Sequence, residues 1–84
     1  MRKILKLSAA WCTPCKDMDA QIERLKGDIR VPIEVIDVNS NPEYTKKYRV
    51  RSIPTLIKLD ESGVEYGRHT GILQDTKFLD FVNE

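Results

Sequence analysis

The stretch WCTPCK at residues 11–16 contains both cysteines of this 84-residue chain, Cys12 and Cys15. An apolar strand pattern precedes it, and an amphipathic helix pattern follows it. Within a helix, residues at this spacing lie one turn apart on the same face. That is close enough for a disulfide, whose Cα atoms must lie within about 7 Å. A disulfide closing so short a loop restrains the unfolded chain little, so we interpret the cysteines as a pair that opens and closes.

Size and charge narrow the possible functions. Residues 1–84, with 40% hydrophobic content, are expected to form a single small domain and a monomer. The 14 basic and 13 acidic side chains give a formal net charge of +1, which does not favour nucleic acid or a membrane as a partner. No apolar run approaches the roughly 18 residues of a membrane span, and no signal-peptide pattern is present. We expect a soluble cytoplasmic protein, where a CxxC pair is more often catalytic or metal-binding than structural.

Hydrophobic and turn patterns predict strands and helices in the order βαβαββα. Helices are indicated by apolar residues recurring every three or four positions, after prolines or capping residues. The first two strands, joined by a helix, should be parallel, and the last two should form an antiparallel hairpin. The expected elements are a strand over residues 4–10, a helix from Thr13 to Gly27-Asp28, a strand over Ile33–Val38, a short helix after Asn41-Pro42 that includes Tyr44 and Tyr48, a strand over Thr55–Leu59, a turn over Asp60–Gly63, a strand over Val64–His69, and a last helix capped by Asp75 or Thr76 that buries Phe78, Phe81 and Val82.

The motif at residues 11–16 resembles that of thioredoxin. WCTPCK differs from the common thioredoxin motif WCGPCK only by Thr13 in place of glycine, and Ile53-Pro54-Thr55 stands before the third expected strand. Thioredoxin-like spacings also hold for Asn41-Pro42, Lys47-Tyr48, Arg51 and Gly71. The resemblance covers nearly the whole chain, without the extra N-terminal strand and helix of the full-length fold. It implies an α/β thioredoxin-like fold with a four-stranded mixed sheet in the order 2-1-3-4 and helices on both faces.

The resemblance also implies thiol–disulfide exchange. Cys12 would be the nucleophile, because unpaired N–H groups and the helix dipole at a helix N-terminus stabilise a thiolate. Cys15, more buried, would then attack Cys12 and release the reduced substrate. Pro14 would keep the two sulfurs in register. Pro54 would be a cis proline that faces the cysteines and exposes the preceding backbone to an extended substrate. No cofactor beyond the Cys12–Cys15 disulfide is implied.

A second group of residues is expected around the cysteines. Trp11 is interpreted as a surface aromatic beside the nucleophile, although it could instead fill the core. Ile53 and Ile72 could line an apolar groove beside Pro54, or they could be ordinary packing residues. Gly71 could let a substrate approach closely, or serve as a turn between strand and helix. The candidate substrate-binding residues are Trp11, Thr13, Ile53, Thr55, Gly71 and Ile72.

The chain departs from the family pattern behind the cysteines. Lys6 stands six positions before Cys12, where thioredoxins have a buried aspartate that assists proton transfer from the second cysteine. The family's partner lysine corresponds to Val35, and Asp37 lies two residues further on the same strand face. We hypothesise that the charges have swapped and that Lys6 reaches towards Asp37; alternatively, its amine lies in water. In either case a cation here should favour thiolate formation, and general-base assistance to Cys15 is in doubt.

Four basic residues precede Pro54 in the sequence, namely Lys46, Lys47, Arg49 and Arg51. Such a run usually forms a solvated helix face. The alternative interpretation is an electropositive rim that steers an acidic partner towards the cysteines.

We predict a thiol–disulfide oxidoreductase that reduces protein disulfides, with a role in electron transport and cell redox homeostasis. It would be recycled by a reductase such as thioredoxin reductase, or by glutathione. One alternative is a glutathione-dependent, glutaredoxin-like enzyme, which small size favours and Thr13-Pro14 disfavours. Another is an adaptor in which the cysteines are dispensable. A zinc site would need four ligands, and His69 is the only histidine, so no metal is expected.

Overall fold

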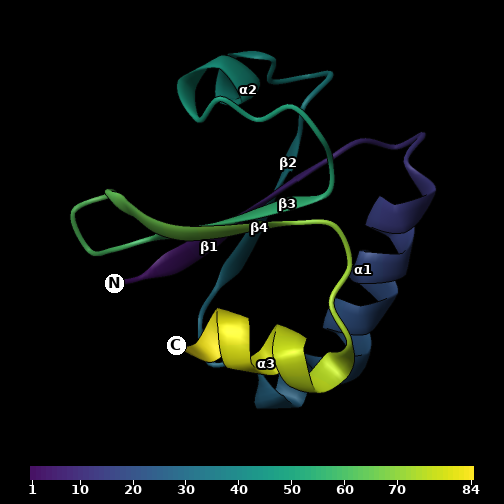
Figure 1. The fold of residues 1–84 in the computed structure, drawn as a ribbon, viewed down its shortest axis with the longest axis vertical. Helices are drawn as coiled ribbons and strands as arrows, with labels where there is room; N and C mark the ends of the chain where they lie inside the picture. Colours follow the sequence, from purple (N-terminus) through teal and green to yellow (C-terminus); the bar gives the residue numbers. More distant parts are fainter.

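The computed structural model describes residues 1–84 and confirms the predicted order of strands and α-helices. One short 3₁₀ helix, η1, directly follows the first α-helix. The elements, labelled in Figure 1, are β1 (Lys3–Ser8), α1 (Thr13–Leu25), η1 (Lys26–Asp28), β2 (Ile33–Asp37), α2 (Glu43–Lys47), β3 (Thr55–Leu59), β4 (Glu65–Thr70) and α3 (Asp75–Asn83). None of the helices has the length and apolar character needed to cross a bilayer.

The four strands form one mixed sheet in the predicted order β2-β1-β3-β4. β1 and β2 are parallel, and their register places Lys6 opposite Val35 and Ser8 opposite Asp37. α1 joins these two strands, because a crossover between parallel neighbours needs a long connection. β3 pairs antiparallel with β1 on one side and with β4 on the other. β1 is therefore a central strand, and its C-terminal end leads into the cysteine motif.

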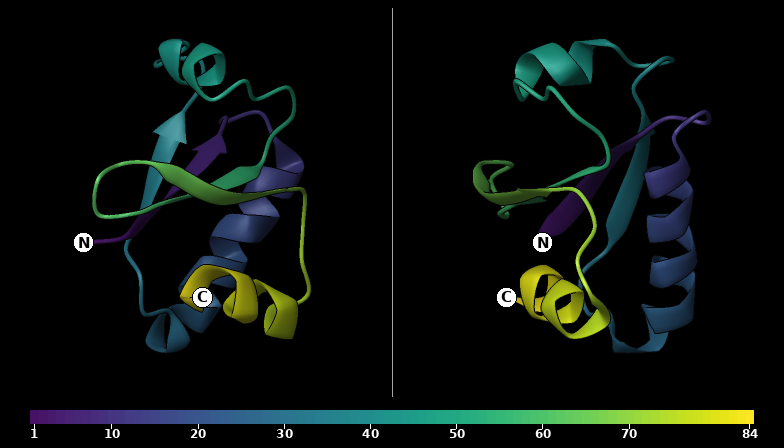
Figure 2. Two further views of the ribbon diagram at one scale, coloured as in Figure 1. Left: turned by 60° about the vertical axis from the view of Figure 1, so that its left-hand side comes forward. Right: turned by 45° about the vertical axis from the view of Figure 1, so that its right-hand side comes forward.

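Helices cover both faces of this sheet, because successive side chains of a strand point to opposite sides. In Figure 2, α1 and α3 lie on one side of the sheet and α2 lies on the other. The buried side chains on the first side are Ile4, Met18, Val31, Leu56, Phe78 and Val82. Those on the second side are Leu5, Leu7, Ile36, Ile57 and Leu59, with Tyr44 and Tyr48 packed against them. Ile4 thus faces α1, and so does Lys6, two residues further along β1.

The β3–β4 hairpin begins its second strand one residue later than predicted. β4 runs over Glu65–Thr70 rather than Val64–His69. The backbone N–H of Val64 donates to Asp60 Oδ1 at 2.9 Å, so Val64 belongs to the turn. Gly63 completes the turn with φ of +82°, a conformation that glycine adopts without a steric penalty.

The start of α3 also differs from the prediction. The N-cap residue is Gln74, so neither Asp75 nor Thr76 takes that position. The Asp75 carboxylate instead accepts hydrogen bonds from the side chains of Gln21 and Arg24 on α1. A tertiary contact between α1 and α3 has therefore replaced the local capping interaction.

Candidate active site

Cys12 and Cys15 lie at the N-terminal end of α1 and are joined by a disulfide. Cys12 is the N-cap residue, with extended backbone angles of φ −93° and ψ 109°. The Cα atoms of the two residues are 5.2 Å apart, which suits a disulfide. The backbone N–H of Cys15 donates to Cys12 Sγ at 3.2 Å. This N–H is one that a helix start leaves without a backbone partner, so it is available to stabilise a thiolate on Cys12.

The two sulfur-bearing residues differ in burial, as expected. Cys15 is completely buried, whereas Cys12 is 5% exposed and packs with Ala9 and Ile53. Pro14 lies in the first turn of α1, where its missing N–H removes no helical hydrogen bond. Cys12 is therefore the more exposed of the two cysteines. No group of three or more His, Cys, Asp or Glu side chains is arranged to hold a metal ion.

The loop before β3 faces the disulfide. The peptide bond between Ile53 and Pro54 is cis, as predicted, and Cys12 Sγ lies 4.0 Å from the carbonyl oxygen of Ile53. The N–H of Gly71 donates to the Pro54 carbonyl at 2.9 Å, which ties the end of β4 to the same loop. Gly71 has φ of +96°, and a Cβ built there would meet no atom within 4 Å. Its backbone conformation requires glycine, while the space beside it is open.

The remaining candidate substrate-binding residues divide into exposed and buried ones. Trp11 is 68% exposed and Ile72 is 49% exposed, so neither fills the core. Thr13 is also exposed. Thr55 is buried, and its hydroxyl donates to the carbonyl of Ser52 at 2.6 Å. The structure therefore places Thr55 beneath the surface, where its hydroxyl is hydrogen-bonded within the loop.

Lys6 forms its ion pair with Asp19, so the hypothesis that it reaches Asp37 is wrong. The alternative with the amine in water is also wrong, because Lys6 is completely buried. Its Nζ donates a second hydrogen bond to the carbonyl oxygen of Cys15 at 3.0 Å. Asp37 instead accepts from the backbone N–H of Asn39 at 2.8 Å. The physical reason is that α1 lies over the sheet face that carries Lys6 and brings its own carboxylate there.

Asp19 is therefore the site residue that the sequence reasoning missed. It follows Cys15 by four positions and so shares a helix face with it. The sequence signal for it was an acidic residue four positions after Cys15, on the helix that must cover the sheet face of Lys6. That signal identifies Asp19 as a possible partner, whereas the family's partner position at Val35 and the shared strand face had favoured Asp37.

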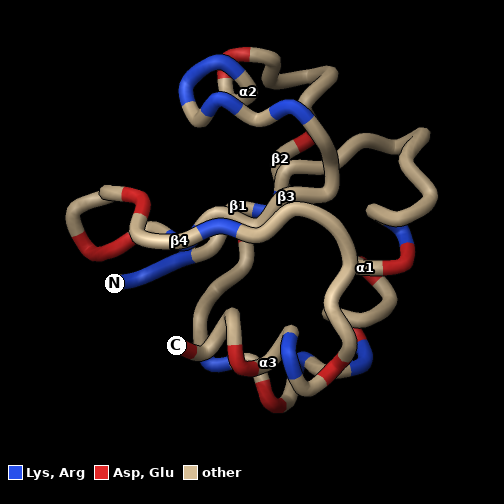
Figure 3. Tube along the Cα trace, viewed as in Figure 1, with Lys and Arg blue, Asp and Glu red and all other residues tan.

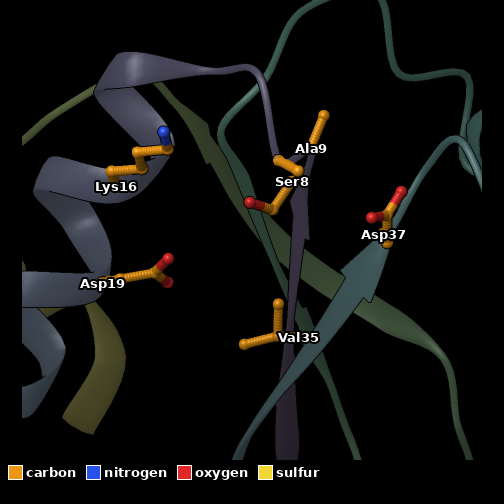
Figure 4. Close-up of a pocket in the computed structure, with 7 residues that line it drawn as sticks. Ser8, Ala9, Lys16, Asp19, Val35 and Asp37 are labelled. Carbon is orange, nitrogen blue, oxygen red and sulfur yellow. The ribbon is translucent and has the colours of Figure 1, made fainter.

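A hollow of about 490 Å³ opens beside this ion pair. Its lining residues are Ser8, Ala9, Ala10, Lys16, Asp19, Val35 and Asp37. Figure 4 shows the Asp19 carboxylate pointing from α1 towards β1, with Asp37 on the far side at the end of β2. Ser8 stands where the thioredoxin pattern has a tryptophan, and this small side chain leaves room for the hollow. The Asp19 side chain is 54% exposed, so water reaches its carboxylate.

Gln21 on α1 holds the segment that follows Gly71. Its Nε2 donates to the carbonyl of Leu73 at 2.8 Å and to Asp75 Oδ1 at 3.0 Å. Arg24 donates to the other oxygen of Asp75 at 2.6 Å. The hydrogen bond from Arg24, followed by that from Gln21, holds the pKa of Asp75 below its ordinary value. These hydrogen bonds hold the segment that follows Gly71 against α1.

The four basic residues before Pro54 are all exposed, and none of them forms an ion pair. They are Lys46, Lys47, Arg49 and Arg51. Figure 3 shows their positions in blue along α2 and the loop that leads to β3. Their charges therefore remain uncompensated at the surface on this side of the site.

Comparison with known proteins places the chain among similar sequences and folds. Residues 2–84 match the family model described as Thioredoxin. A thioredoxin of Rickettsia bellii is 32% identical over 77 residues, which cover 89% of this chain and 72% of that protein. A thioredoxin of Staphylococcus epidermidis is 44% identical over 57 residues, which cover 66% of this chain and 55% of that protein. The solved structure of Fasciola hepatica thioredoxin superimposes with a TM-score of 0.84 at 29% identity, covering 96% of this chain and 77% of that one. A variant thioredoxin of Halobacterium salinarum gives a TM-score of 0.86 at 25% identity, covering 96% and 71% of the two chains.

Proposed function

This chain belongs to the thioredoxin family and is a thiol–disulfide oxidoreductase, and we propose that it reduces protein disulfides with Cys12 as nucleophile and Cys15 as resolving thiol. The observation that carries this assignment of roles is the position of Cys12. It caps α1, its sulfur accepts the N–H of Cys15 at 3.2 Å, and it is the more exposed of the two. A thiolate is stabilised in such a position and is the reactive form of a cysteine.

The proposed cycle starts from the dithiol form. Cys12 loses its proton, and its thiolate attacks one sulfur of the substrate disulfide. The substrate S–S bond breaks, and the sulfur that leaves takes up a proton. Cys15 then loses its proton and attacks Cys12 Sγ, which releases the second substrate sulfur to be protonated in turn. Two electrons and two protons have moved to the substrate, and the Cys12–Cys15 disulfide remains.

The surroundings of Cys12 support an extended polypeptide as the substrate. Trp11, next to Cys12 in the chain, and Ile72, next to Gly71, present exposed apolar side chains. The carbonyl of Ile53, 4.0 Å from Cys12 Sγ, belongs to backbone that lies directly beside the reactive sulfur. An extended chain can pair with such backbone while its side chains meet the apolar surface. Gly71 adds no side chain to this surface, and the space beside it is open.

The partners we propose follow from the chemistry of the cycle. The disulfide form must receive two electrons and two protons before the next turnover, and we assign this step to a reductase of the thioredoxin reductase type. The names of the similar proteins support this choice over glutathione. We propose the cytoplasm as the location, because its reducing conditions keep such a pair in the dithiol form.

The experiment that tests the roles is insulin reduction with dithiothreitol as the electron donor. Cys12→Ser should reduce the rate to that of dithiothreitol alone. Pre-reduced Cys15→Ser, freed of dithiothreitol and then mixed with insulin, should instead accumulate a mixed disulfide between Cys12 and insulin, which mass spectrometry detects, because no resolving thiol is left to break it. Ser62→Ala, a change in the β3–β4 turn, is the control and should keep the wild-type rate. Full activity in Cys12→Ser would contradict the role of Cys12, and a wild-type rate no faster than dithiothreitol alone would favour the adaptor interpretation.

A further inference from the structure

Lys6 is the only charged side chain that is completely buried, and both of its hydrogen-bond partners belong to α1. Nζ donates to the carbonyl oxygen of Cys15 at 3.0 Å and to the carboxylate of Asp19. A buried ammonium persists only when it is paired and hydrogen-bonded. These contacts hold the positive charge of Lys6 directly behind the residue that carries the second sulfur.

The two charges of this ion pair differ in their contact with water. The side chain of Lys6 is 0% exposed, whereas that of Asp19 is 54% exposed. Water and salt screen the carboxylate far more than the ammonium. Asp19 therefore offsets only part of the Lys6 charge at the position of Cys15. The other charged groups around the hollow are Lys16 on α1 and Asp37 at the end of β2.

We propose that Asp19 is a positioning residue that sets the reduction potential of the Cys12–Cys15 pair by limiting how much of the Lys6 charge acts on the reduced sulfurs. This inference rests on the dithiol–disulfide cycle proposed above. The thiolate formed on reduction is negative and the disulfide is uncharged, so a nearby cation stabilises the reduced form. A pair whose reduced form is stabilised is more oxidising. Lys6 thus raises the potential, and Asp19 moderates that effect.

The test is equilibration of the protein with glutathione buffers at pH 7. Two glutathione thiols become glutathione disulfide and give two electrons and two protons to the protein, whose S–S bond opens to a dithiol. Asp19→Asn should shift this equilibrium about tenfold towards the dithiol, which corresponds to about 30 mV. Lys6→Met should shift it in the opposite direction. In the Lys6→Met background, Asp19→Asn should have a clearly smaller effect, because a carboxylate that Lys6 no longer holds is screened by water.

A second readout separates this electrostatic role from a purely structural one. The rate at which iodoacetamide modifies reduced Cys12 follows its thiolate fraction. The pH profile of this rate should move to lower pH in Asp19→Asn and to higher pH in Lys6→Met. If Asp19 only compensated a buried lysine, Asp19→Asn would lower stability and leave both the profile and the potential unchanged, which would overturn the proposal.

Matched variants control for charge and for folding. Asp17→Asn removes the same charge from an exposed position of the same helix, and Asp19→Glu keeps the charge. The amide of Asp19→Asn still offers Lys6 an acceptor, and circular dichroism with a thermal melt verifies the fold. A shift in Asp19→Asn no larger than that in Asp17→Asn would refute the proposal, as would an equal shift in the Lys6→Met background. The reduction potentials of these variants can be measured whether or not the chain reduces insulin. A failure of this inference can therefore be distinguished from a failure of the proposed function.

Discussion

The two sides of the active-site disulfide differ in how closely they follow the thioredoxin pattern. In front of it, the cis peptide bond before Pro54 matches what the resemblance implies, and the glycine expected at position 71 adopts a positive φ. Behind it, a buried Lys6 paired with Asp19 stands where thioredoxins have a buried aspartate. The front offers backbone and apolar surface, whereas the back offers charge. If both proposals hold, separate residues of this chain serve substrate docking and the control of charge at the sulfurs.

This division of roles can be tested by substituting residues on one side of the disulfide at a time. A substitution in front should alter the reaction with protein substrates and leave the reduction potential unchanged. A substitution behind should alter the potential, as proposed for Asp19. Any substitution that changes both quantities to the same extent would show that the two sides are not independent.

The largest effect in front is expected at Trp11. Trp11→Ala should lower kcat/KM for insulin about tenfold, because exposed aromatic residues beside a binding site carry much of the binding free energy. The fold should be unaffected, since this side chain is 68% exposed. Tyr66→Ala, which changes an exposed aromatic residue on β4, is the control and should react like the wild type. Equal losses in the two variants would argue against a docking role for Trp11.

Gly71→Ala should have a smaller effect, measured as the free energy of unfolding in urea. A Cβ at φ of +96° costs about 1–2 kcal/mol in backbone strain. Gly27→Ala serves as the matched control, because Gly27 lies in η1 without a positive φ and has open space around it. That control should leave stability unchanged or raise it slightly. If both variants were destabilised equally, the backbone conformation of Gly71 would not be the cause.

The smallest effect is expected at Asp75, which fastens the segment after Gly71 to α1. Its pKa is lowered mainly by the hydrogen bond from Arg24, so the folded state binds a proton less readily than the unfolded state. The stabilisation is therefore present at pH 7 and is lost as the pH falls below about 4. The melting temperature of Asp75→Asn should lie slightly below that of the wild type at pH 7 and converge with it in acid. Asp80→Asn, on the exposed side of α3, should show no such convergence.

Local sequence signals predict most of the fold. The bounds of β3 agree with the prediction because Pro54 limits this strand at one end and the turn beginning at Asp60 limits it at the other. The parallel pair and the antiparallel hairpin also agree with the prediction, since connection length restricts the possible topologies. The strand order agrees with what the resemblance to thioredoxin implies. In front of the disulfide, the cis bond before Pro54 agrees with what the resemblance implies, and Trp11 is exposed as interpreted, whereas the burial of Thr55 was not foreseen.

The back of the site was harder to predict because it depends on packing between elements. Helical periodicity predicts that Asp19 shares a face with Cys15. The rotation of α1 about its own axis on the sheet decides whether that face contacts Lys6. The same limit explains Asp75, whose capping preference is local and whose observed partner, Arg24, lies on another helix. In both cases an ion pair with a residue of α1 decided the outcome, which neither the family pattern at Lys6 nor the local capping preference at Asp75 could show.

The most direct test of the division of roles is the glutathione equilibrium of Trp11→Ala and Asp19→Asn, measured side by side with the wild type. We predict that Trp11→Ala has the wild-type equilibrium constant even though its reaction with insulin is slowed. We predict that Asp19→Asn shifts the constant about tenfold towards the dithiol. Equal constants for Asp19→Asn and the wild type, or a shift of similar size in Trp11→Ala, would contradict the account.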